Sequence, residues 1–182
     1  MHHGGGSDLT VPLVCVVGKS GTGKTTFLEK LIAELKRRGY RVGTIKHNIH
    51  DFEVDQPGKD SWRHARAGSD VAVVTSPTKL AIIERLEQEL TLDEVAARIT
   101  GVDIVLVEGY KYSNKPKIEV SRRGMGRELL TPPDELVALV TDQSFALDVP
   151  QFALHDAAGV ASLLEARFLA DTGNEQRVKL SK

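Results

Sequence analysis

The sequence has a single cysteine, a single tryptophan and almost no net charge. One cysteine, Cys15, excludes an internal disulfide framework and a cysteine-rich zinc module, and it fits a reducing compartment. The net charge is close to zero, because 24 Lys and Arg residues are balanced by 25 Asp and Glu residues. It therefore does not favour binding to duplex nucleic acid or to an anionic membrane. Long apolar runs are also missing: the most apolar early stretch, 11–17, contains a proline and ends at Gly18. Such a stretch is too short for a membrane span and wrongly flanked for a signal peptide. We therefore expect a cytoplasmic protein with no nucleic-acid or membrane partner.

The 182 residues, 41% of them apolar, suit one globular domain with a single core. Both ends have compositions that do not support packing, because residues 1–8 are rich in glycine and residues 171–182 are polar. We expect these ends to be flexible. The sequence therefore predicts one domain over residues 9–170.

Apolar runs alternate with helical periodicities through this domain. The continuous run at 13–17 is typical of a strand buried on both faces of a parallel sheet. Helical spacing follows from Phe27 to Leu35, and Gly39 marks the end of that helix. Further strands are expected at 42–45, 71–75, 80–83, 104–107, 118–120, 136–140 and 152–154, and further helices after Asp60, at a capping box of Thr91 and Glu94, and from Asp156. This pattern predicts an α/β fold, a mostly parallel β-sheet flanked by helices on both faces, whose ligands bind beyond the carboxyl ends of the strands.

The loop between the first strand and the first helix carries a nucleotide-binding motif. It matches the P-loop pattern G-x-x-x-x-G-K-[ST] in the strand-to-helix context that the pattern requires, with the residues Gly18, Lys19, Ser20, Gly21, Thr22, Gly23, Lys24 and Thr25, followed by Thr26. The glycines let backbone N–H groups surround phosphate oxygens, and the helix presents its positive end to the same charge. Lys24 supplies a catalytic point charge to the outer phosphates, and the Thr25 hydroxyl suits Mg²⁺. We call 18–25 the phosphate loop and expect it to bind a nucleotide with Mg²⁺.

An acidic residue at the end of a neighbouring strand completes the expected Mg²⁺ site. Glu108 follows the buried run 104–107, and Gly109 lets the chain turn away while the carboxylate faces the phosphates. Asp103 stands at the other end of the same run, which is the wrong end for this role. Thr25 and Glu108 are therefore the predicted metal ligands.

Base recognition is less clearly marked. Asn114-Lys115-Pro116-Lys117 resembles a guanine-reading N-K-x-D box, but a lysine cannot accept the two hydrogen bonds that the carboxylate of that box accepts. Asp142, just past the run 136–140, stands where a late strand presents a base-reading acid; an ordinary turn residue is the alternative.

A polar segment rich in histidine follows the second expected strand. Its three histidines and three aspartates suit a solvated loop near phosphates better than a transition-metal site. Asp60 precedes a short helix, so it either caps that helix or acts catalytically by orienting Mg²⁺ or water. Lys46 and Lys59 can neutralise phosphate charge.

Several of these segments together resemble the MobB family of molybdopterin-guanine dinucleotide biosynthesis adapter proteins. They are Gly43-Thr44-Ile45-Lys46-His47, Asp55-x-Pro57-Gly58-Lys59-Asp60-Ser61-x-Arg63-His64, Ala67-Gly68, Val107-Glu108-Gly109-Tyr110-Lys111 and Pro116-Lys117-Ile118-Glu119-Val120. The resemblance covers about Val14 to Asp142 and adds Lys46 and His47 to the nucleotide site. It implies a GTP-binding P-loop protein, dimeric and only feebly hydrolytic, that assists a molybdenum cofactor guanylyltransferase in attaching GMP to molybdopterin.

Two other functions stay open at this point. A small-molecule kinase would need an arginine-rich lid, for which Arg122, Arg123 and Arg127 are the candidates. A dimeric ATP-driven switch of the deviant Walker A kind would use Lys19 across its dimer, although Ser20 departs from that pattern. From Lys111 to Arg127 there are also six basic residues and one acid, which suits either a solvated face or a patch for an anionic partner.

Overall fold

The computed structural model describes residues 11–48, 50 and 52–170. The chain forms two compact units, one made of the residues up to His47 and those from Val95 onward, and one made of Asn48–Glu94. The single domain expected over 9–170 stays a prediction, and the second compact unit inside it is a feature that the sequence pattern did not indicate. Each unit is described by itself below.

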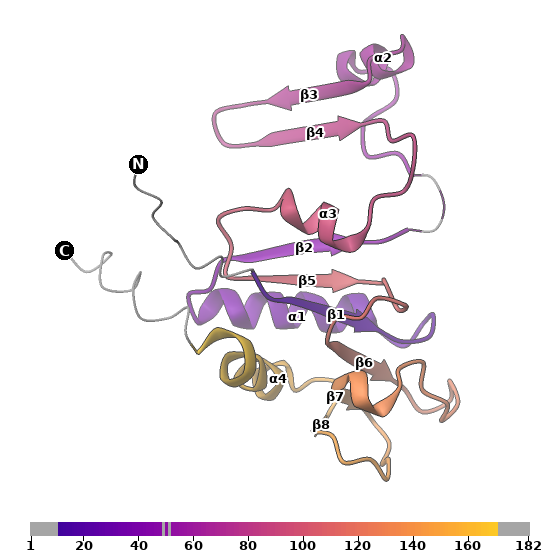
Figure 1. Cartoon of the computed structure of the whole chain (residues 1–182), viewed down its shortest axis with the longest axis vertical. Helices are drawn as coiled ribbons and strands as arrows, with labels where there is room; N and C mark the ends of the chain where they lie inside the picture. Colours follow the sequence, from indigo (N-terminus) through magenta and orange to yellow (C-terminus); the bar gives the residue numbers. More distant parts are fainter. Residues whose placement is uncertain (1–10, 49, 51, 171–182) are drawn as a thin grey trace, which may run out of the picture. The chain divides into compact units, whose positions relative to one another are not determined.

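The larger unit is built on a six-stranded sheet whose described pairings are all parallel (Figure 1). The strands follow the order β2-β5-β1-β6-β7-β8. Their bounds are β1 Leu13–Val17, β2 Val42–Lys46, β5 Ile104–Glu108, β6 Lys117–Ser121, β7 Leu136–Thr141 and β8 Gln151–Phe152. The expected parallel sheet is confirmed, with β8 ending before Leu154. Because the strands are parallel, their carboxyl ends share one edge, and the phosphate loop follows β1 at that edge.

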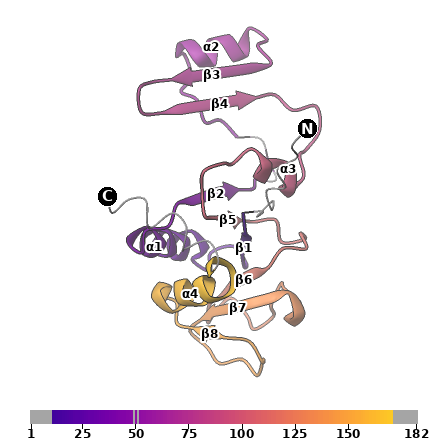
Figure 2. The same ribbon diagram turned by 60° about the vertical axis from the view of Figure 1, so that its left-hand side comes forward.

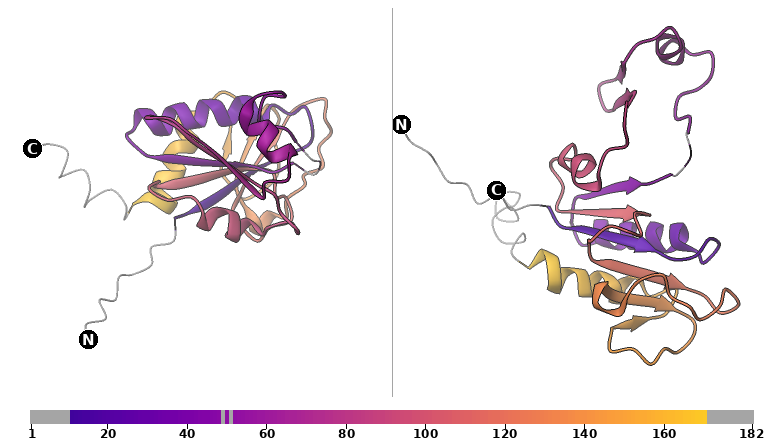
Figure 3. Two further views of the ribbon diagram at one scale, coloured as in Figure 1. Left: turned by 90° about the horizontal axis from the view of Figure 1, so that it is seen from above. Right: turned by 45° about the vertical axis from the view of Figure 1, so that its right-hand side comes forward.

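Two helices cover one face of this sheet (Figures 2 and 3). They are α1, Lys24–Arg37, and α4, Ala157–Leu164, which continues as a π-helical segment Glu165–Leu169. Apolar side chains that alternate along the strands pack against them, among them Val14, Val16, Ile104, Leu106, Ile118 and Val140. The Arg38 guanidinium joins the two helices, because it donates to the carbonyl of Ala158 at 2.9 Å and to the hydroxyl of Ser162 at 3.0 Å.

The opposite face of the sheet is partly polar. Lys117, Glu119 and Ser121 alternate along β6 and are all buried. The Glu119 carboxylate accepts the backbone N–H groups of Leu130 at 2.8 Å and Thr131 at 2.9 Å, so the segment between β6 and β7 closes over this face. Buried carboxylates need such partners, because an unpaired charge is costly away from water.

The smaller unit consists of a helix and a hairpin. Helix α2, Asp60–Arg66, contacts β3, Val71–Thr75, which pairs antiparallel with β4, Leu80–Glu84. Both strands were expected, but their antiparallel pairing in a separate sheet was not. The remaining α-helix, α3, Leu92–Ala97, starts in the smaller unit and ends in the larger one. It begins at the expected capping box, in which Thr91 N–H donates to Glu94 at 2.7 Å and Glu94 N–H donates to Thr91 Oγ1 at 3.3 Å. In the part of the chain that the structure describes, no helix combines the length and the apolar character needed to cross a membrane.

Candidate nucleotide-binding site

The phosphate loop has the backbone that its glycines permit. Gly18, Gly21 and Gly23 have φ angles of 143°, 79° and 93°, which residues with a β-carbon rarely adopt. Gly18 is also needed for space, because a β-carbon there would collide with the carbonyl oxygen of Val120 on β6. The loop is therefore pressed against the neighbouring strand, and α1 begins directly after Gly23.

Lys24 lies back over this loop. Its Nζ donates to the carbonyl oxygens of Gly18 at 2.9 Å and Lys19 at 2.8 Å. Burial is the main cause of a lowered pKa at Lys24; the Glu108 carboxylate opposes this shift, and Lys46 adds to it. A phosphate at the loop would add its negative charge to that of Glu108 and so further stabilise this partly desolvated cation.

The two predicted metal ligands are brought together. Thr25 Oγ1 donates to Glu108 Oε1 at 3.0 Å, and Lys46 Nζ lies 3.9 Å from the same carboxylate oxygen. A hydroxyl and a carboxylate are the hard oxygen donors that Mg²⁺ takes beside phosphates. These two donors are adjacent beside the phosphate loop, so they fit Mg²⁺. Elsewhere among the described residues there is no cluster of three His, Cys, Asp or Glu that could hold another metal ion.

Other residues of the loop divide into those that hold it and those that face outward. Thr22 is buried, and its hydroxyl donates to the carbonyl of Lys19 at 3.0 Å, so its side chain holds the loop closed. Ser20, Gly21 and Thr26 are exposed. Their predicted contact with a nucleotide stays a prediction.

Lys19 contacts a segment of its own chain. Its Nζ donates to the carbonyl of Met125 at 3.3 Å and lies 3.7 Å from the Glu128 carboxylate. Both partners belong to the segment after β6. Lys19 is thus engaged within this chain, which gives no support to the alternative in which it reaches across a dimer.

His47 and Asp142 lie at the ends of β2 and β7. The N–H of His47 donates to the carbonyl of Glu108 at 2.9 Å, and its ring stacks on Tyr110 with 4.3 Å between ring centroids. Asp142 Oδ1 accepts the N–H of Arg123 at 2.6 Å, so one carboxylate oxygen already has a backbone partner. Asp142 therefore anchors the segment after β6, and base reading stays a prediction for it. Tyr110 was not among the predicted site residues, although its place directly after Glu108 and Gly109 was a signal that it lies beside the site.

Asp60 belongs to the smaller unit. The residue that caps α2 is Lys59, and Asp60 is the first residue of the helix, so of the two alternatives for Asp60 the N-cap is wrong. Its side chain is 90% exposed and lies 3.9 Å from Arg63, three residues on. A catalytic role for Asp60 stays a prediction.

The basic segment 111–127 is not one exposed patch. Lys117 is fully buried, and its ammonium donates to the carbonyls of Ser113 and Lys115 and to Glu135. Arg127 donates to the carbonyl of Ser144 at 2.6 Å. Alternation along β6 turns Lys117 inward, so Lys117 belongs neither to a solvated face nor to a patch for an anionic partner, and for the other basic residues both alternatives stay open. Asp103 pairs with Arg41 at 2.7 Å; burial acts to raise its pKa, but hydrogen bonds from Arg41 hold it below its usual range.

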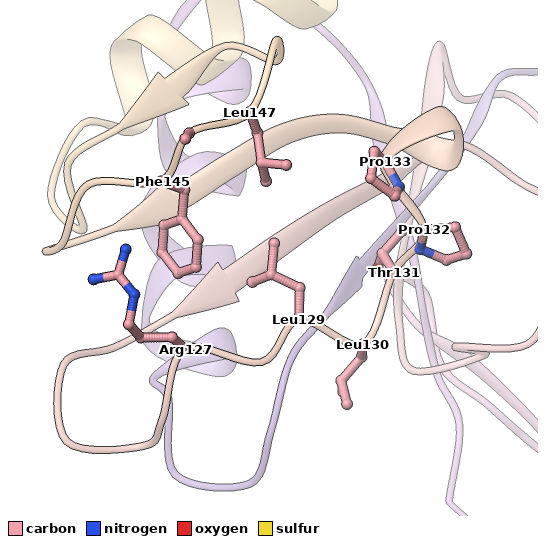
Figure 4. A pocket seen from close by; sticks show the side chains of 9 residues that line it. Arg127, Leu129, Leu130, Thr131, Pro132, Pro133, Phe145 and Leu147 are labelled. Atoms are coloured by element: carbon pink, nitrogen blue, oxygen red, sulfur yellow. The ribbon is translucent and has the colours of Figure 1, made fainter.

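A groove of about 560 Å³ lies beside this segment (Figure 4). Its lining comes from Arg127 and from residues 129–133 and 145–147 and is mostly apolar, with the Arg127 guanidinium carbon 5.1 Å from the ring centroid of Phe145. None of the lining residues belongs to the phosphate loop.

Comparison with known proteins identifies the family. Residues 13–142 match the family described as molybdopterin guanine dinucleotide synthesis protein B, MobB. The chain belongs to the MobB family. It is 39% identical over 160 residues to the molybdopterin-guanine dinucleotide biosynthesis adapter protein of Escherichia coli, covering 85% of this chain and 91% of that protein. It is 37% identical to the adapter protein of Haemophilus influenzae, covering 85% and 88%. The fold matches that of Bacillus subtilis MobB with a TM-score of 0.68 and 26% identity, over 86% of this chain and 98% of that one. The MobB match includes β1, the phosphate loop, Glu108 and Asp142.

Proposed function

We propose that this protein is a GTP-binding adapter that assists a molybdenum cofactor guanylyltransferase in forming molybdopterin guanine dinucleotide in the cytoplasm. Two MobB relatives that cover most of the chain are named as adapter proteins of this biosynthesis. The proposal that the protein binds GTP rests on one observation: Lys24, Thr25 and Glu108 lie together at the phosphate loop. Molybdopterin is the proposed second ligand of the complex with the guanylyltransferase.

The geometry supports the following division of roles. Backbone N–H groups of the phosphate loop and the Lys24 ammonium bind phosphate oxygens. Thr25 and Glu108 hold Mg²⁺, which when bound neutralises part of the phosphate charge. Lys46, 3.9 Å from Glu108, adds positive charge on the side of β2. The residues thus bind and orient a nucleotide before its use by the partner.

We also expect hydrolysis to be slow, because arginines that could act on the phosphates are engaged elsewhere. An arginine finger supplies about 10³ to 10⁵ of the rate in related phosphoryl transfers. Arg123 and Arg127 are both tied to backbone carbonyls beyond β7, at 3.4 Å and 2.6 Å. We therefore expect the isolated protein to be at most a slow GTPase, and this also disfavours a kinase whose lid uses these arginines.

The proposed assembly is a homodimer, and the hairpin of the smaller unit supports it. Val73 and Ile82 pair on one face of β3 and β4 and are 55% and 60% exposed, and Leu80 on the same face is 64% exposed. A two-stranded hairpin is marginally stable alone, and contiguous exposed apolar side chains commonly mark an interface. We propose that a second copy of this chain covers these apolar side chains. Sedimentation should give a dimer for the wild type and a monomer for Ile82→Lys; a wild-type monomer would refute the assembly.

A reconstitution tests the adapter function. Purified guanylyltransferase, molybdopterin and Mg²⁺-GTP are combined with wild-type protein, with Lys24→Met, or with neither. We expect wild type to raise dinucleotide formation above the partner alone and Lys24→Met to fail, while steady-state GTP hydrolysis by the isolated protein stays far below one turnover per second. Equal dinucleotide yields in all three mixtures, or rapid hydrolysis by the isolated protein, would refute the proposal.

A further inference from the structure

The turn after β5 has a backbone conformation that side chains rarely adopt. Gly109 has a φ of 108° and Tyr110 a φ of 51°, and Tyr110 is the only non-glycine residue with positive φ within the described ranges 11–48, 50 and 52–170. A left-handed backbone is disfavoured for a residue with a β-carbon, so it persists where its surroundings hold it. The Tyr110 ring makes a contact that can hold this conformation.

That contact is with His47. The two rings stack with centroids 4.3 Å apart and planes 30° apart. The turn is pressed closely against the same residue, because a β-carbon on Gly109 would lie 3.0 Å from His47 Cβ. The His47 N–H also donates to the carbonyl of Glu108 at 2.9 Å. Backbone and ring contacts therefore join the end of β2 to the end of β5.

This junction lies directly beside the proposed Mg²⁺ ligands. Lys46 and Glu108 are the last paired residues of β2 and β5, and beyond them the chain continues from His47 into the smaller unit and from Gly109 back across the sheet. The Glu108 carboxylate needs a fixed strand end to keep its 3.0 Å hydrogen bond with Thr25. Side chains that hold a ligating carboxylate in place commonly decide how well it binds metal.

We propose that Tyr110 is a positioning residue: by stacking on His47 it holds the ends of β2 and β5 together and keeps Glu108 beside Thr25 for Mg²⁺-dependent GTP binding. This inference rests on the proposed GTP binding. It assigns Tyr110 an action through Glu108 and not a contact with the nucleotide.

The test compares GTP affinity with and without Mg²⁺ by calorimetric titration for wild type, Tyr110→Gly, Tyr110→Phe and Tyr112→Ala. Tyr110→Gly removes the ring and accepts the positive φ without strain, so relief of backbone strain opposes the loss of the stacking contact and the fold should be retained, which a cooperative thermal transition checks. Its enhancement of GTP affinity by Mg²⁺ should nevertheless fall by about two- to tenfold, the range expected for one aromatic pair, with Mg²⁺-free affinity unchanged. Tyr110→Phe keeps the ring and should keep the full enhancement.

Tyr112→Ala is the matched control, because this tyrosine is in the same turn and 90% exposed. Proton spectra of the histidine rings give a second readout: the ring-current shift of His47 should be present in wild type and Tyr110→Phe and absent in Tyr110→Gly. A Tyr110→Gly variant with full Mg²⁺ enhancement, or an equal loss with and without Mg²⁺, would overturn the inference alone. A wild type whose GTP affinity ignores Mg²⁺ would overturn the proposed metal-dependent binding and this inference together.

Discussion

Lys24→Met keeps the length of the side chain at the phosphate loop and removes its charge. The ammonium has three hydrogens, and two of them are bonded to the carbonyls of Gly18 and Lys19 at 2.9 and 2.8 Å. At least one further donor is therefore available to a phosphate oxygen. One hydrogen bond to a charged partner contributes about 1.5–3 kcal/mol, which corresponds to about 10- to 150-fold in the dissociation constant.

Calorimetric titration with Mg²⁺-GTP measures this loss. The fold should survive, because the two released carbonyls lie on a partly exposed loop where water can replace the ammonium. Lys30→Met, on an exposed position of α1, is the matched control and should bind like wild type. A folded Lys24→Met protein with a dissociation constant within about twofold of wild type, which is below about 0.5 kcal/mol, would refute the reasoning.

The pH dependence of wild-type binding provides a further check on the same residue. Burial lowers the pKa of Lys24 in the free protein, and bound phosphate would raise it. GTP affinity should therefore be highest below the pKa that Lys24 has in the free protein. It should fall as the pH rises from that pKa toward the higher pKa that Lys24 has in the complex. Lys24→Met should lack this alkaline decline.

Three other substitutions test separate parts of the structure. Glu108→Gln should weaken Mg²⁺-dependent GTP binding far more than Mg²⁺-free binding, since the carboxylate acts through the cation; equal losses in the two titrations would contradict this. Asp142→Asn should lower the preference for GTP over ATP, because an amide presents a donor where guanine also donates, and an unaltered ratio of the two affinities would move base recognition elsewhere. Glu34→Gln should destabilise the fold at neutral pH, because hydrogen bonds from Arg37 and Arg38 lower the pKa of Glu34 from 4.5 to about 2. That stability is present above pH 4.5 and is lost as pH falls toward 2; a difference in urea midpoint that is the same at pH 7 and pH 3 would count against it.

Local patterns allowed the elements around the phosphate loop to be predicted. The run at 13–17 is buried on both faces, and the spacing from Phe27 to Leu35 gives one apolar stripe. The residues of β1 and α1 alone therefore predict a strand and a helix. Glu108 could be named because it ends a run that is completely buried. These are properties of a few consecutive residues, and sequence reasoning captures them well.

Features that depend on distant partners could not be predicted. Lys117 looks like a surface charge until Glu135 and the carbonyl of Ser113 are brought to it. The Tyr110 stack depends on His47, which is far away in the sequence. The pairing of β3 with β4 is itself local, because only residues 76–79 separate the two strands, but a strand's alternation does not state that the pair stands outside the main sheet.

The strand order has a consequence for the time course of folding. Among the described strands, β1 pairs with β5 and β6, so the central strand has no partner strand until the chain has been synthesised through Glu108. At ribosomal rates this delay lasts about 5–20 s, and such non-local pairings are slow to form. The inserted unit Asn48–Glu94 is contiguous, so its hairpin has local partners during that interval. Nascent β1, whose buried residues are valine and cysteine, is thus a segment that needs protection from aggregation before the sheet closes.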